Sequence, residues 1–154
     1  MRRGKTRTLG AMYRTVVAAL TLAATCLAWG QAPVDVRTLL LGTWTWTRPG
    51  NNCTETHTYR ADGSRSSTSG AERSDTRYEI STQPSAKGFW RLDVTTVKDY
   101  GGRDCSDTED DETGLKWTVY LRFDQTGNRL IYCYEESLTN CYGPFTRAVR
   151  AEGA

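Results

Sequence analysis

The only histidine of this chain, His57, stands two residues after Glu55 in a threonine-rich run, residues 54–60. Residues two apart on a β-strand point to the same face, close enough for a carboxylate and an imidazole to work as an acid–base pair. The plainer interpretation is a hydrogen-bonded polar pair, or two side chains in solvent if the strand faces the other way. We favour the plainer interpretation because no nucleophile or set of metal ligands accompanies the pair, so no enzyme is expected.

Cysteines are the second group of residues with chemistry of their own. Outside the first thirty residues there are four: Cys53, Cys105, Cys133 and Cys141. An even number predicts two disulfides if the domain is exported. The chain has no C-x-x-C spacing and His57 is its single histidine, so we expect neither a zinc site nor another bound cofactor.

The first thirty residues have the pattern of a secretion signal. Five basic residues precede an apolar stretch over residues 16–28, and Ala28-Trp29-Gly30 offers a small-x-small cleavage site before Gln31. We therefore expect a signal peptide over residues 1–30, a single domain over residues 31–154, and a periplasmic or extracellular location. The apolar stretch is shorter than the roughly 20 residues of a spanning helix, so no membrane span is expected.

The charge balance changes once that leader is set aside. It holds five of the 20 Lys and Arg residues, which leaves 15 against 18 Asp and Glu, a net charge of −3. No run of Lys and Arg remains, and this argues against a nucleic-acid partner. The densest charge cluster is acidic, residues 104–112, and it lacks the spacing of an EF-hand loop. We favour a solvated surface loop there over a calcium site.

Short β-rich runs separated by turn signals must position these side chains. Residues 32–40 are expected to form a short helical or irregular lead-in. Eight sequential strands without long helices predict an all-β fold, an eight-stranded antiparallel up-and-down barrel that is monomeric. The expected strands are residues 42–48, 54–60, 64–69, 75–82, 88–98, 115–124, 129–135 and 140–149.

Alternation along these strands predicts which side chains face the lumen of the barrel. An aromatic and polar set results, and it makes up the candidate ligand-binding residues. An eight-stranded barrel is either filled by its own side chains or holds one small ligand, and the pattern leaves both open. The candidates are Trp46, Glu55, His57, Tyr59, Trp90, Trp117, Tyr132 and Tyr134.

Topology narrows the disulfide pairing to two sets. Alternate loops of an up-and-down barrel lie at opposite ends, which gathers the cysteines at the end with the longer loops. One set is Cys53–Cys141 with Cys105–Cys133, and the other is Cys133–Cys141 with Cys53–Cys105. We favour the first because it joins near neighbours of a closed barrel twice, and a disulfide needs Cα atoms within roughly 7 Å.

The run Leu41-Gly42-Thr43-Trp44 resembles the Gly-x-Trp opening of lipocalins and of bacterial lipocalin-like domains, and residues 58–64 resemble the aromatic-x-x-Asp-Gly hairpin of the bacterial group. The resemblance implies a lipocalin-like barrel in which Gly42 and Trp44 open the first strand and Arg147 or Arg150 packs over Trp44. More loosely, Leu-x-Gly-x-Trp followed by Cys53 resembles periplasmic inhibitors of metalloproteases, in which residues 31–39 would enter the protease cleft.

Together these features predict a binding protein. The leading expectation is a small apolar or aromatic ligand in the lumen. The alternative is a protein partner, with the chain inhibiting a secreted or periplasmic hydrolase. An enzyme that uses Glu55 and His57 is the third possibility.

Overall fold

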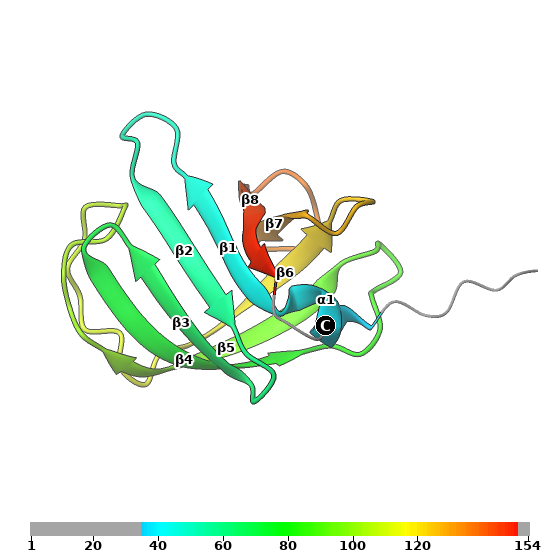
Figure 1. Ribbon diagram of the computed structural model, residues 1–154, viewed down its shortest axis with the longest axis horizontal. Coiled ribbons are helices and arrows are strands. Elements are labelled where there is room, and N and C mark those ends of the chain that lie inside the picture. The colour runs from blue at the N-terminus through cyan, green and yellow to red at the C-terminus, as the bar shows by residue number, and fades with distance from the viewer. Residues whose placement is uncertain (1–34, 151–154) are drawn as a thin grey trace, which may run out of the picture. The chain divides into compact units, whose positions relative to one another are not determined.

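The structure is a computed structural model and describes residues 35–150. Its eight antiparallel strands follow one another in chain order and close into one barrel, as the sequence predicted (Figure 1). The strands are β1 (Gly42–Thr47), β2 (Thr54–Tyr59), β3 (Ser64–Ser69), β4 (Glu72–Ile80), β5 (Trp90–Asp99), β6 (Lys116–Phe123), β7 (Arg129–Cys133) and β8 (Cys141–Arg150). The expected signal peptide, residues 1–30, lies outside the described residues.

Only β3 keeps its predicted bounds, and the other seven strands differ from the prediction by one to three residues at one or both ends. Strand β4 begins at Glu72, three residues early, because a tight turn at Gly70 pairs Glu72 directly with Ser69 of β3. Strand β7 ends at Cys133, so Tyr134 lies beyond the ladder and is 61 % exposed. The inward phase of the other strands follows the expected alternation, with buried and half-buried side chains on one face.

A short helix closes one end of the barrel, here called the floor. Helix α1 (Val36–Leu40) begins where the Asp35 carboxylate accepts hydrogen bonds from the Arg37 amide and the Thr38 hydroxyl. It buries Val36 and Leu40. Of the segment 31–39 that would enter a protease, residues 36–39 belong to this helix, and residues 31–34 lie outside the described part of the chain.

Trp44 fills the floor above this helix. Its side chain is fully buried, and its indole Nε1 donates to the Leu40 carbonyl at 2.8 Å. The Arg147 guanidinium lies 4.0 Å from the centre of the Trp44 ring and donates to the carbonyls of Leu41 and Gly127 at 2.6 and 3.0 Å. Arg147 therefore makes the contact that the resemblance implied for Arg147 or Arg150.

Aliphatic and aromatic side chains pack the barrel directly above the floor. The core cluster draws on helix α1 and on every strand except β3, so the lower half of the lumen is solid. The buried core includes Ile80, Leu92, Val94, Val119, Leu121, Leu130, Tyr132 and Phe145.

Among the described residues, no helix is long and apolar enough to cross a membrane.

The two disulfides are Cys53–Cys105 and Cys133–Cys141, with Cα atoms 5.4 and 4.0 Å apart. Two disulfides are confirmed, but the favoured pairing, Cys53–Cys141 with Cys105–Cys133, is wrong. Cys133 and Cys141 are direct cross-strand partners of β7 and β8. Cys105 is carried away from them by the segment between β5 and β6, which folds across the barrel's open end.

The path of that segment depends on a close backbone approach. Gly102 has φ of +104°, and a Cβ there would lie 2.5 Å from the carbonyl oxygen of Ala71, in the turn between β3 and β4. Only glycine fits this approach. The Ala71 amide then donates to the Arg103 carbonyl, and the Cys105 amide donates to the Ser69 hydroxyl at 3.0 Å. These contacts bring Cys105 to Cys53 instead of Cys133.

Candidate functional site

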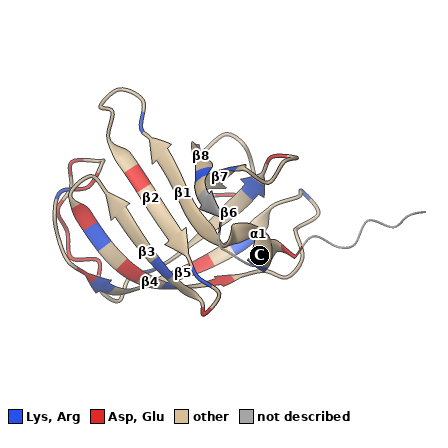
Figure 2. Ribbon diagram, in the orientation of Figure 1, with Lys and Arg blue, Asp and Glu red and all other residues tan. Residues whose placement is uncertain are grey.

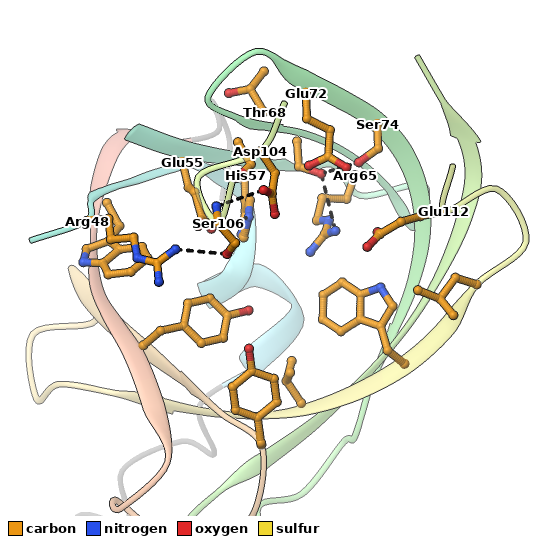
Figure 3. Close-up of a pocket in the computed structure, with 18 of the residues that line it drawn as sticks. Arg48, Glu55, His57, Arg65, Thr68, Glu72, Ser74, Asp104, Ser106 and Glu112 are labelled. Atoms are coloured by element: carbon orange, nitrogen blue, oxygen red, sulfur yellow. Dashed lines mark hydrogen bonds and ion pairs between the residues drawn. The ribbon is translucent and has the colours of Figure 1, made fainter. Parts of the chain in front are cut away.

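The upper half of the lumen is hollow. A cavity of about 400 Å³ lies between the packed core and the loop-rich end, here called the mouth (Figure 3). Its walls combine aromatic side chains with many polar ones. The floor half of the barrel is therefore filled by its own side chains, and the mouth half is open.

The expected lumen residues separate into three groups. Trp46, Glu55, His57 and Trp117 line the cavity, as does the exposed Tyr134 at the mouth. Tyr59 and Tyr132 are fully buried and contribute to the core beneath it. Trp90 stands at the start of β5, at the floor end, where it packs half-buried against the core away from the cavity.

A buried chain of hydrogen bonds joins the cavity to the core below. His57 Nδ1 lies 3.1 Å from the Tyr132 hydroxyl, which lies 2.8 Å from the Tyr59 hydroxyl. The imidazole also stacks on Phe145, with ring centres 4.8 Å apart. Burial, helped by the charge of Arg65, holds the pKa of His57 well below 6.5, so the ring is neutral at physiological pH.

Glu55 and His57 do share one face, but they do not form an ion pair. Their nearest side-chain atoms, Oε2 and Nε2, are 3.9 Å apart, which is too long for a hydrogen bond, and the imidazole is neutral. Burial also raises the pKa of Glu55. The pair therefore offers hydrogen-bonding groups to the cavity more readily than it offers a charged acid–base couple.

Several residues that line the cavity were not among the sequence candidates, and Arg65 is the most deeply buried charged one. It is 3 % exposed and projects into the cavity from β3, between the rings of Trp117 and Tyr59, 5.1 and 5.8 Å from their centres (Figure 3). Its Nε donates to the Thr76 hydroxyl at 3.0 Å and its Nη2 to the Ser67 hydroxyl at 3.4 Å. Nη1 is buried without a hydrogen-bond partner in the part of the chain that the structure describes.

Carboxylates crowd the cavity above Arg65. We call Glu55, Glu72, Asp104 and Glu112 the acidic rim, and all four line the cavity. Acidic residues also gather on the segment between β5 and β6 (Figure 2). Burial and then the charge of Glu112 raise the pKa of Glu72 to about 7. Like charges close together disfavour ionisation, so the rim would be stabilised by added positive charge.

Arg48 is the other cation of the cavity, and it is already engaged. Its Nη1 donates to the Cys105 carbonyl at 2.8 Å and to the Ser106 hydroxyl at 3.0 Å, which ties the crossing segment to β1. Within residues 35–150, no three His, Cys, Asp or Glu side chains are grouped so as to hold a metal ion.

Comparison with known proteins adds no relative: no family model, no curated protein and no solved structure matches this chain. The closed eight-stranded antiparallel barrel is consistent with a lipocalin-like fold. Membership of the bacterial lipocalin-like group stays a prediction from the short motifs.

Proposed function

We propose that this protein binds a small molecule in the mouth half of its barrel. The observation that carries the proposal is the cavity of about 400 Å³ above a sealed, packed floor. Ligand sites commonly enclose about 300–1,000 Å³ and combine apolar walls with a few oriented polar groups. Trp46, Trp117 and Tyr142 supply flat apolar walls here, which favours a ligand with an aromatic or apolar body.

Binding fits the chemistry of the lumen better than catalysis. His57 is neutral and its Nδ1 lies within hydrogen-bond distance of Tyr132, while its Nε2 is 3.9 Å from Glu55. Among the described residues, no serine, threonine or cysteine side chain is hydrogen-bonded to this imidazole, so it has no nucleophile to activate. We therefore propose a binding protein without enzymatic activity.

The proposed setting is outside the cytoplasm. Two disulfides are typical of proteins from a non-reducing compartment. Export by the leader at residues 1–30 is part of the proposal, because that segment lies outside the described residues.

Native mass spectrometry tests the proposal. Protein purified without denaturation is expected to carry an added small mass that disappears when the sample is denatured. Ser67 lines the cavity beside Arg65, so Ser67→Phe should place a ring inside it, obstruct the ligand and abolish the added mass. Ser66 is the next residue on β3 and points to the outer face, so Ser66→Phe is the matched control and should keep the ligand. Retention by Ser67→Phe would place the ligand elsewhere and contradict lumen binding.

A further inference from the structure

We propose that the ligand is a small zwitterion, with a carboxylate held by Arg65 deep in the lumen and an ammonium group held by the acidic rim. The inference rests on the proposed function, since it assigns the chemistry of the molecule in the same cavity. Two independent observations carry it: an incompletely bonded buried cation, and a set of carboxylates directly above it.

The Arg65 guanidinium is buried and incompletely hydrogen-bonded. A buried charge is costly unless it is paired and hydrogen-bonded. Arg65 has neutral hydroxyl partners at Nε and Nη2 and none at Nη1. Among the described residues no carboxylate lies within 4.0 Å of it. A guanidinium in this state is complementary to a planar oxyanion such as a carboxylate, which accepts two parallel hydrogen bonds.

This guanidinium lies at the bottom of the cavity, next to the packed core. Arg65 pairs with Tyr59 on one side and Thr76 on the other, at the level where the core ends. Its side chain extends toward the mouth as far as Ser67, because Nη2 reaches the Ser67 hydroxyl. The anion site therefore lies in the deep part of the cavity, with the ring of Trp117 alongside it.

The acidic rim lies closer to the mouth than Arg65 does. Ser69 pairs with Glu55 on β2 and with Glu72 on β4, so both carboxylates share one row across three strands. That row is two residues beyond Ser67, and a strand rises about 3.3 Å per residue. The two charge sites are therefore separated by about 7 Å along the strands.

Neither charge alone suits this cavity. A simple anion would pair with Arg65 but would lie beneath Glu55, Glu72 and Glu112. A simple cation would relieve the rim but would leave Nη1 of Arg65 buried without a partner. A molecule with both charges, separated by a rigid body of about 7 Å, satisfies the two ends at once.

Isothermal titration calorimetry with four matched probes tests the inference. The probes are 4-(aminomethyl)benzoate, 4-methylbenzoate, 4-methylbenzylamine and 4-methylbenzyl alcohol, which carry both charges, one charge or none on the same ring. Protein freed of retained ligand is expected to bind the zwitterion about ten-fold or more tightly than each of the others, since each charge-assisted contact is worth about one decade of affinity.

Variants at the two ends separate their contributions. Arg65→Gln should weaken the zwitterion and 4-methylbenzoate by about ten-fold and leave 4-methylbenzylamine unchanged or improved. Glu72→Gln should weaken the zwitterion and the amine and leave 4-methylbenzoate unchanged or improved. Glu79→Gln, on the exposed outer face of β4, is the control and should change nothing. If Arg65→Gln does not fold, Glu72→Gln against Glu79→Gln decides the test.

The outcomes distinguish this inference from lumen binding in general. Binding of the neutral alcohol as tightly as the zwitterion, or failure of all four probes, overturns the zwitterion. Lumen binding then stands or falls on the added mass seen by native mass spectrometry. A retained molecule that lacks either charge likewise overturns the zwitterion and leaves lumen binding intact.

Discussion

Two arginines of the barrel lie over tryptophan rings, one at the floor and one in the deep part of the cavity, and their surroundings are opposite. At the floor, Arg147 lies over Trp44 and donates to the backbone carbonyls of Leu39, Leu41 and Gly127. In the deep part of the cavity, Arg65 lies over Trp117 with two side-chain hydroxyls as acceptors and, among the described residues, no acceptor at Nη1. Arg147 uses its hydrogen bonds to hold the fold together. Arg65 keeps a hydrogen-bond donor for a group that the described residues do not supply.

The largest expected effect lies at the floor. Trp44→Ala would remove a fully buried ring and leave a cavity, lowering the free energy of unfolding by about 3–5 kcal/mol in a denaturant melt. Its neighbour Thr43 is half-buried and shares one hydrogen bond with Thr58, so Thr43→Ala should cost about 1 kcal/mol or less. A greater loss for Thr43→Ala would mean that strand β1 faces the other way.

Both disulfides lie at the mouth, and removing either one should lower the free energy of unfolding. Cys53–Cys105 closes a separation of 52 residues and Cys133–Cys141 one of 8. On the chain-entropy model, replacing the first pair by alanine costs about 4 kcal/mol and the second about 2.5 kcal/mol. Thermal melts of the two double variants measure the difference. Equal losses would show that restriction of the unfolded chain is not the main contribution.

The two arginines provide the sharpest contrast. Arg147→Met removes hydrogen bonds to three backbone carbonyls and should destabilise the protein by about 2–3 kcal/mol. Arg65→Met replaces an incompletely paired buried charge with an apolar chain, so its effect should lie within about 1 kcal/mol of zero or be stabilising. Urea unfolding of ligand-free protein tests both. A large loss in Arg65→Met would show that this residue serves the fold.

The smallest effect concerns pH. Folding raises the pKa of Glu72 from 4.5 to about 7, so the folded state binds more protons than the unfolded chain in that window and stability falls as pH rises through it. Glu72→Gln should match the wild type near about pH 4 and exceed it at about pH 8, by no more than about 1 kcal/mol because the side chain is partly in solvent. If the wild type were more stable than Glu72→Gln at about pH 8, the negative charge of Glu72 would not be destabilising among the carboxylates of the acidic rim.

The alternation of side chains along the strands was sufficient to predict most of the fold. Runs such as residues 117–123 alternate clearly between large apolar and other side chains, and their inward faces followed directly. Arg65 escaped notice because residues 64–69 are almost uniformly polar, so hydrophobicity could not show which face was inside. The pairing of Arg65 with Tyr59 could have revealed its orientation, because directly opposed residues on adjacent strands face the same side and Tyr59 is predicted to face the lumen.

The disulfide pairing shows where such reasoning stops. Residues 100–115 have no periodicity, and their path is set by the contact of Gly102 with Ala71, more than twenty residues away in the chain. Nothing local to Cys105 indicated that it would cross the mouth to Cys53. A hairpin link between adjacent strands, as in Cys133–Cys141, needed only the register of β7 and β8.

Both ends of the described chain leave the barrel from its sealed side. Helix α1 covers the floor, and Arg150 pairs with Gly42 at the same level (Figure 1). An attachment made directly at residue 35 or residue 150 would therefore join the molecule at its base, on the side opposite the entrance of the cavity. A surface-immobilised sensor, a fusion partner or a lengthened tail could all be joined there without obstructing the entrance.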